Sequence, residues 1–213
     1  MNCFEDSLRR ALISKRMFIA IALLIIVVSL SGMGSELHRV CVPVVCTVPY
    51  TTALLEEYES GFIKSYLPRC SITSYILSKL FACAISGGLA EVIGVYISVQ
   101  YLLPKGEENE IPVIYYGLLF LTGAVWAIFS SLLCVVTKSR YVAYGGGFVA
   151  FYMMVILCER YFPKLYTLNP TEWFMYQHEW VFGQWGIVAL LFGISLILIC
   201  VYYCFAGRLI EDV

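Results

Sequence analysis

Residues 56–79, EEYESGFIKSYLPRCSITSYILSK, form a charged and turn-rich segment in a chain that is otherwise mostly apolar. The segment lies between two runs that are apolar enough for lipid, and it is long enough for a short helix and a turn outside the bilayer. A membrane domain offers few such segments to a soluble protein. We therefore expect residues 56–79 to contact a partner; the alternative is a solvated loop whose charges only set the topology.

The composition is typical of a membrane protein. The chain has 213 residues, of which 61% are hydrophobic and 14% are charged, and its mean hydropathy is +0.82. Soluble domains are about 45–50% apolar and about 25% charged. We therefore predict an all-α, polytopic membrane protein. The net charge of −1 gives no overall attraction to nucleic acid, so no nucleic-acid partner is expected.

The apolar runs predict where the helices begin and end. Residues 2–14 have the spacing of an amphipathic helix, which we expect to lie on the membrane surface as an elbow helix. Pro43 and Pro49 favour a kink or a break in the second span, and we place that span inside the bundle because its freed carbonyl groups need neighbours. A single transmembrane domain, residues 1–213, contains the six predicted spans: residues 17–33, 40–55, 80–103, 111–137, 141–158 and 185–206.

Basic residues predict the orientation, because cytoplasmic segments carry an excess of Lys and Arg. With the N terminus in the cytoplasm, residues 56–79 and both termini lie inside the cell, so we expect a multi-pass protein of the plasma membrane. Ten basic residues then lie inside and four outside; the ten are Arg9, Arg10, Lys15, Arg16, Lys64, Arg69, Lys79, Lys138, Arg140 and Arg208, and the four are Arg39, Lys105, Arg160 and Lys164. On the outer side, Trp173, Trp180 and Trp185 fit an aromatic belt.

The nine cysteines lie mostly inside apolar runs, and their spacing lacks the paired CxxC and His of a zinc site. We predict small buried hydrophobic side chains, with no metal and no disulfide framework. The two histidines, His38 and His178, fall in predicted outer loops. Ser195 in the last span therefore has no histidine base to activate it, which makes an intramembrane hydrolase the least favoured class.

Glu91 lies near the middle of the third predicted span. An unpaired charge there costs about 2.5–3.5 kcal/mol or more, so Glu91 should face the bundle, be protonated or be paired. One hypothesis places it on a substrate path, and the other makes it a buried hydrogen bond that holds helices together. The small residues Gly87, Gly88 and Gly94 around it predict close helix packing.

Two stretches stand out against the layout of an amphipathic helix and six spans: VPYTTALLEEYESGFIKSYLPR (residues 48–69) and SYILSKL (residues 74–80). With this layout, they resemble the permease subunit of type-2 ABC transporters, a class of small six-span exporter permeases. In that family an acid, a glycine and basic residues follow the second span. The matching positions here, which the resemblance implies to be ATPase-coupling residues, are Glu57, Gly61, Lys64, Arg69 and Lys79.

The resemblance also implies partners and a mechanism. A separate cytoplasmic ABC ATPase would bind ATP and Mg²⁺, since this chain has no GxxxxGK[ST] phosphate loop and is expected to bind no cofactor and to be no enzyme itself. A second permease copy or a related subunit would complete the path in the lipid. The expected activity is export of a hydrophobic or amphipathic cargo such as a peptide, an antibiotic or a lipid. The alternative is a membrane immunity or assembly subunit that transports nothing.

Overall fold

The computed structural model describes residues 3–66, 70–102, 112–162, 164–173, 180 and 182–211. Within these ranges the chain is helical and contains no strand. The elements are α1 (Cys3–Leu12), α2 (Lys15–Ser31), α3 (Glu36–Val45), α4 (Ala53–Glu59), α5 (Phe62–Tyr66), α6 (Ile72–Ile97), η2 (Ser98–Leu102), α7 (Val113–Thr137), α8 (Arg140–Ile156), η3 (Leu157–Tyr161), η4 (Tyr166–Leu168), η5 (Pro170–Glu172) and α9 (Gln184–Glu211).

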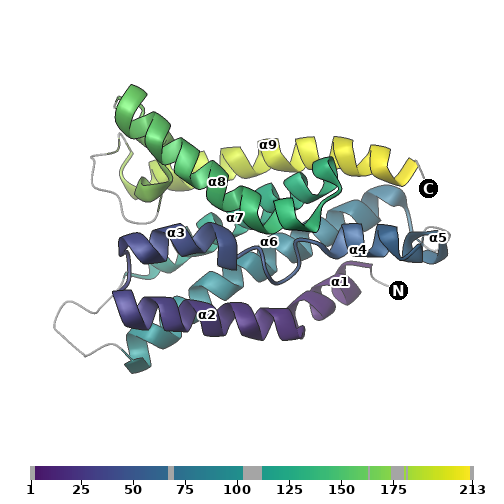
Figure 1. Ribbon diagram of the computed structural model, residues 1–213, viewed down its shortest axis with the longest axis horizontal. Helices are drawn as coiled ribbons and strands as arrows, with labels where there is room; N and C mark the ends of the chain where they lie inside the picture. The colour runs from purple at the N-terminus through teal and green to yellow at the C-terminus, as the bar shows by residue number, and fades with distance from the viewer. Residues whose placement is uncertain are drawn as a thin grey trace.

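The helices form an elongated up-and-down bundle (Figure 1). Helices α2, α3, α6, α7 and α9 run roughly along its long axis, and both termini lie at the same end as α4 and α5. We call this the terminal end, and the end with the turn between α2 and α3 the opposite end. Helix α7 is the central one, because 72% of its most apolar window is buried, against 17% for α9.

In the part of the chain that the structure describes, four helices are long and apolar enough to cross a membrane, as expected for a membrane-embedded protein. They span Ile72–Leu102, Val113–Thr137, Arg140–Tyr161 and Gln184–Ile210. A fifth crossing is possible by length if α1 and α2, which meet at a bend of 47°, count as one broken span. The predicted spans at residues 111–137, 141–158 and 185–206 agree with α7, α8 and α9 to within a few residues.

The predicted span at residues 40–55 is not one continuous helix but is broken, as Pro43 and Pro49 favour. Helix α3 contains Pro43 and ends at Val45, and α4 begins only at Ala53, with a turn over residues 46–52. The break is stable because threonine hydroxyls satisfy backbone carbonyl groups: Thr47 Oγ1 donates to the oxygen of Val44 at 2.6 Å, and Thr51 donates to that of Thr47.

Helix α6 begins at Ile72, eight residues before the predicted start of the third span. Ser71 caps it by accepting a hydrogen bond from the backbone N–H of Ser74 at 3.3 Å. Polar residues before Leu80, such as Thr73, Ser74 and Ser78, favoured a loop in the sequence analysis. They lie in the first turns of α6. Residues 72–79 of the predicted segment 56–79 therefore belong to α6.

Small residues let the helices that surround α6 come close to it, as predicted. A methyl group added at Gly88 would lie 2.6 Å from the carbonyl oxygen of Phe120 on α7. One added at Gly94 would lie 2.6 Å from Cβ of Leu24 on α2. Larger side chains at these positions would separate three helices, since real Cβ contacts this short do not occur.

The aromatic residues of the opposite end divide into two groups. Trp173 is only 2% exposed and stacks on Trp126 of α7 with 5.9 Å between ring centroids, so it belongs to the core and not to a belt. Its Nε1 donates to the carbonyl oxygen of Thr167 at 3.2 Å. Trp185 is 70% exposed, as an interfacial tryptophan would be.

Candidate functional site

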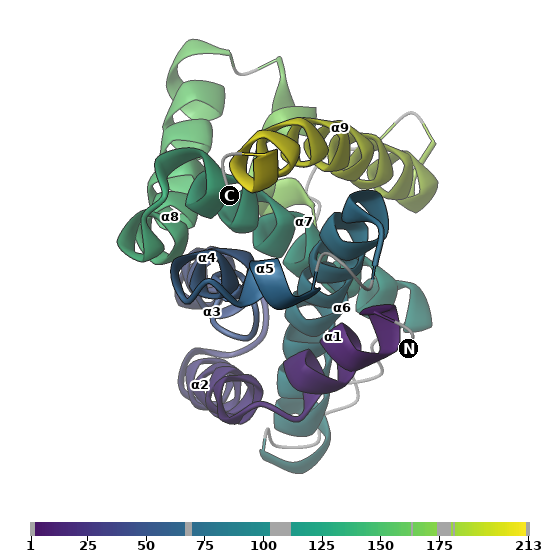
Figure 2. The ribbon, with the colours of Figure 1, turned by 90° about the vertical axis from the view of Figure 1, so that its right-hand side faces the viewer.

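The acidic helix α4 lies at the centre of the terminal end, and its carboxylates form ion pairs with basic side chains of four surrounding helices. Figure 2 views this end, and shows α4 and α5 with α1, α2, α6 and α8 around them. Leu54 and Leu55 anchor α4 in the core, where each is at most 2% exposed. This leaves the three acids of the helix, Glu56, Glu57 and Glu59, to point towards different neighbours.

Glu57 holds the most buried of these contacts. Its Oε1 accepts a hydrogen bond from Lys79 Nζ of α6 at 2.6 Å, and its Oε2 accepts one from the hydroxyl of Tyr75. Arg10 of α1 approaches the same carboxylate at 3.8 Å. The side chains of Glu57 and Lys79 are only 15% and 6% exposed, and Lys79 also donates to the hydroxyl of Tyr50 at 3.0 Å.

The other two acids of α4 extend the network to α2 and α8. Glu56 Oε1 accepts from Arg16 at 2.7 Å and from Thr52 Oγ1 at 2.7 Å. Glu59 pairs with Arg140 at the start of α8. These contacts are more exposed than that of Glu57, so each contributes less to stability. Together the three acids connect α4 to α1, α2, α6 and α8, so that a movement of α4 acts on all four.

The contact of Glu56 predicts a specific acid sensitivity. Partial burial acts to raise the pKa of Glu56, but hydrogen bonds from Arg16 and Thr52 and the Arg16 charge outweigh it, and the pKa is lowered from its ordinary value of 4.5. A carboxyl group with a lowered pKa stabilises the fold above its unfolded-state pKa, and ceases to do so as the pH falls through the folded-state value.

We therefore expect Glu56→Gln to lower stability by about 0.5 kcal/mol at neutral pH, a small value because the pair is partly exposed. The difference from the wild type should shrink as the pH falls below the ordinary value of 4.5 and through the lowered folded-state pKa of Glu56. Thermal unfolding in detergent at a series of pH values measures this difference. A difference that stays constant down to the lowest pH would contradict the assignment.

The remaining predicted coupling residues lie beside α4 or outside the described residues. Gly61 has a φ of +70°, which ends α4 and turns the chain into α5, and a left-handed turn of this kind favours glycine. Lys64 lies on α5 with its side chain exposed to solvent. Arg69 lies outside the described residues. The structure thus brings Glu57 and Lys79 together and places Gly61 and Lys64 on the adjoining exposed turn.

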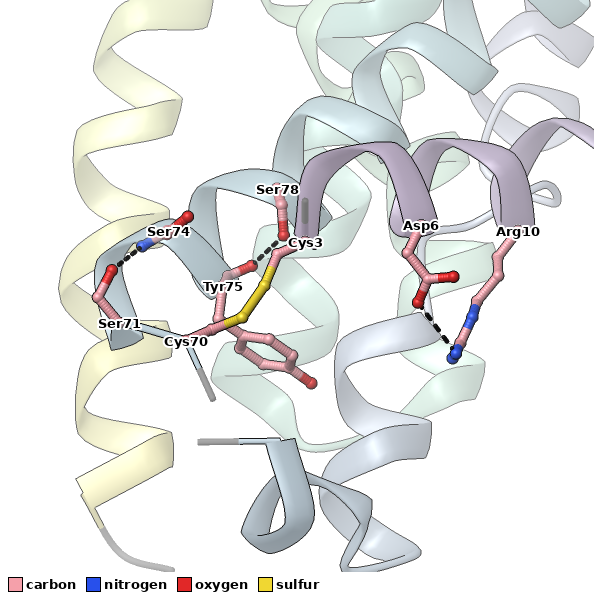
Figure 3. Close-up of a disulfide and its surroundings, with 8 residues drawn as sticks. All are labelled: Cys3, Asp6, Arg10, Cys70, Ser71, Ser74, Tyr75 and Ser78. Atoms are coloured by element: carbon pink, nitrogen blue, oxygen red, sulfur yellow. Dashed lines mark hydrogen bonds and ion pairs between the residues drawn. A yellow bond between two sulfur atoms is a disulfide. The ribbon is translucent and has the colours of Figure 1, made fainter. Parts of the chain in front are cut away.

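A disulfide joins Cys3 at the start of α1 to Cys70 just before α6, so the prediction of no disulfide was wrong (Figure 3). The two Cα atoms are 7.2 Å apart, and 67 positions separate the residues in sequence. Figure 3 shows the bond beside Tyr75, whose hydroxyl contacts Glu57. The bond therefore ties the start of α1 to the residues just before α6. The expectation that the cysteines are buried side chains holds only in part for the free ones, because Cys200 and Cys204 are exposed.

Glu91 lies in a second polar site, in the interior of the bundle. His38 Nε2 is 2.8 Å from Glu91 Oε1, and both side chains are 0% exposed. Cys46 Sγ lies 3.5 Å from the other oxygen, Oε2. His38 was predicted in an outer loop and this is corrected: it lies on α3, and its burial follows from its contact with an acid 53 positions away. The contact joins α3 to α6, as the helix-packing hypothesis for Glu91 requires.

This geometry is not that of a hydrolytic triad. The carboxylate of Glu91 lies between the imidazole and the thiol, whereas in a triad the imidazole is the group in contact with the nucleophile. Ser195 donates its hydroxyl to the carbonyl oxygen of Phe192 at 2.7 Å on an exposed face of α9. Within the described residues, no group of three His, Cys, Asp or Glu side chains has the arrangement of a metal site.

Sequence reasoning missed His38, Arg16 and Arg140 as partners of acids. A signal for His38 was present, because an acid inside a span needs a hydrogen-bond partner. A histidine can be buried beside such an acid more easily than a lysine or an arginine, and this chain has two histidines. Arg16 and Arg140 lie in the first turns of α2 and α8, on the same predicted side of the membrane as the acids of residues 56–79. No protein-family model, curated protein or solved structure matches this chain.

Proposed function

We propose that this chain is the membrane-spanning permease subunit of an ABC transporter, driven by a separate cytoplasmic ATPase that docks on α4 and α5. The observation that carries the proposal is the ionic network of α4. ATP binding by a partner changes the shape of this membrane subunit only if the contact surface is linked to several helices. Helix α4 has this property, since its acids contact α1, α2, α6 and α8.

In this proposal the exposed turn is the docking surface and the buried pair transmits the movement. Gly61 and Lys64 lie on the exposed side, where they contact the ATPase. Glu57 and Lys79 form the link to α6. The energy for transport is the difference in affinity of ATP for the two conformations of the ATPase dimer, which α4 passes to the helices.

The proposed membrane topology has six crossings with the terminal end in the cytoplasm. Helix α2, joined to the elbow helix α1, supplies the first crossing. Residues 40–55, which contain most of α3 and the turn after it, supply the second as a broken span that ends where α4 begins. The excess of basic residues at the terminal end supports this orientation. Broken helices occur inside membranes where neighbouring side chains satisfy the backbone, as Thr47 and Thr51 do here.

A second permease copy or a related subunit would complete the transport path. The apolar outer faces of α8 and α9 support a position in lipid or against another membrane subunit. Since the spans are aliphatic and aromatic, a hydrophobic or amphipathic cargo fits better than a sugar or an anion. Export of a peptide, an antibiotic or a lipid is the corresponding activity.

Co-purification tests the docking surface. An ABC ATPase from the same cells should copurify with the wild type, and Lys64→Glu should lower the amount recovered about tenfold or more, because it reverses a charge on the exposed turn. Glu36→Lys is the matched control: it reverses an exposed charge at the opposite end and should leave recovery unchanged. Recovery that is equal for both variants and the wild type would contradict the assignment of α5 as the docking surface.

The same experiment separates the transporter from the alternative of an immunity or assembly subunit. A subunit of that kind would be recovered with membrane partners but with no nucleotide-hydrolysing protein. Cells from which the ABC ATPase has been deleted would then still show the protective or assembly effect of this chain. That pair of results would replace the transport proposal.

A further inference from the structure

We propose that the start of α8 and the groove between α7 and α8 bind one anionic phospholipid. Its phosphate lies among Arg16, Lys138 and Arg140, and one of its acyl chains lies along the groove. The inference does not depend on an ATPase or on a cargo. It rests on two adjoining surface features of opposite character, a charged cavity and an apolar groove.

The charged cavity lies at the terminal end, between α2, α4 and α8 (Figure 2). It is open to solvent and has a volume of about 560 Å³. A phosphodiester carries one negative charge and would offset the net charge of +1 on its lining, whereas the ammonium group of a zwitterionic headgroup would leave it positive. The net charge is that of three basic and two acidic side chains: Arg16, Lys138, Arg140, Glu56 and Glu59.

The two arginines of the cavity keep hydrogen-bond donors for a phosphate after their ion pairs are made. Arg16 donates to Thr52 and Glu56 with Nη1. Arg140 contacts Glu59 with Nη2. A guanidinium group has five N–H donors, so each arginine can bind a phosphate oxygen as well as its carboxylate.

The first turn of α8 adds backbone donors to the same cavity. Ser139 and Arg140 line the cavity at this turn, and in the described residues the side chain of Ser139 does not cap it. The first N–H groups of a helix have no partner within the helix, and the helix dipole is positive there. This end of α8 therefore attracts the same anion as the basic side chains.

The apolar groove begins where the charged cavity ends, because Tyr141 lines both. Two glycines shape the groove, which has a volume of about 550 Å³. A methyl group at Gly146 would lie 2.6 Å from Cδ1 of Leu133, so this glycine lets α8 approach α7. One at Gly145 would meet no described atom within 4 Å, so the groove is open there. Other lining residues are Phe129 on α7 and Val142, Val149 and Met153 on α8.

The length of the groove fits one leaflet of a membrane. From Val142 to Met153 the chain rises about 16 Å along an α-helix. The hydrocarbon core of a bilayer is about 30 Å thick, so one leaflet is about 15 Å thick. An acyl chain that starts at the charged cavity would end near the middle of the bilayer. A phospholipid therefore fits both features at once, whereas a free phosphate would leave the groove empty.

Native mass spectrometry of the full chain, titrated with single lipids in detergent, tests the headgroup. Phosphatidylglycerol should bind about fivefold more tightly than phosphatidylcholine with the same acyl chains, the factor expected from one basic residue near an anionic lipid. Lys138→Asn should abolish this preference. Lys138 has a φ of +51°, and Asn is among the residues that adopt such a backbone most readily.

Lys164→Asn is the matched control for the headgroup, because it removes an exposed lysine from the loop after η3. It should keep the preference of the wild type. Equal binding of the two lipids to the wild type would overturn the proposal, and so would a preference that Lys138→Asn retains.

A second variant tests the acyl chain and does not depend on Lys138. Gly145→Phe should lower the affinity for phosphatidylglycerol about fivefold, because its ring fills the groove and the chain loses its contacts there. Gly193→Phe on α9 is the matched control, since a methyl group at Gly193 also meets no described atom within 4 Å. Glycerol phosphate, which has no acyl chain, should not displace the bound lipid at an equal concentration. Displacement by glycerol phosphate, or equal affinities of the two glycine variants, would contradict the phospholipid assignment.

Discussion

Glu57→Gln is expected to lower the stability of the protein by about 3 kcal/mol, the largest effect of any single acid on α4. The substitution leaves the ammonium group of Lys79, which is 6% exposed, without its carboxylate. Removing one partner of a buried ion pair costs about 3–5 kcal/mol, because the remaining charge is left without compensation. Thermal unfolding of the purified protein in detergent, followed by circular dichroism at neutral pH, measures this loss.

Two further variants make this prediction specific. Glu59→Gln is the matched control on the same helix, and its pair with Arg140 is nearly half exposed, so it should cost much less stability than Glu57→Gln. Glu57→Gln combined with Lys79→Met should recover most of the stability, since no unpaired charge then remains. A Glu57→Gln variant no less stable than Glu59→Gln would show that the buried pair does not hold α4.

The uninterrupted apolar helices were predictable because their signal is local. Helices α7, α8 and α9 are each bounded by charged, glycine or proline residues, and hydropathy alone places their ends within a few positions. The break after Pro43 was also predictable in kind. Its place was not, since the turn at residues 46–52 depends on where Thr47 and Thr51 can bond to the backbone.

The polar sites were only half predictable, because each one joins distant parts of the chain. Glu91 was identified by its position inside a span, and the family resemblance named both Glu57 and Lys79. Neither pairing was predicted, and His38 was placed in a loop. A side chain of this kind is buried only when the fold brings an opposite group to it, and that information is in the tertiary structure alone.

Reduction of the Cys3–Cys70 disulfide is the second change with a large expected effect. The bond closes a loop over 67 positions, and the chain-entropy model gives about 4 kcal/mol for such a loop. This value is an upper limit, because the membrane already restricts the unfolded chain. A reductant should therefore lower the melting temperature of the air-oxidised protein. Cys3→Ser should melt at the lower temperature with or without reductant, whereas Cys200→Ser, at an exposed free thiol, should behave like the wild type.

The same bond tests the orientation, because the cytoplasm keeps thiols reduced and the outside of the cell does not. With the terminal end in the cytoplasm, Cys3 and Cys70 should be thiols in living cells and form the disulfide only after lysis in air. Acid quenching of intact cells followed by a maleimide reagent of high mass measures this as two additional shifts in the wild type relative to the Cys3→Ser/Cys70→Ser variant. If the two cysteines are instead oxidised in cells, the terminal end faces outwards, where no cytoplasmic ATPase reaches α4. The opposite end would then be the one that faces the cytoplasm, against the excess of basic residues.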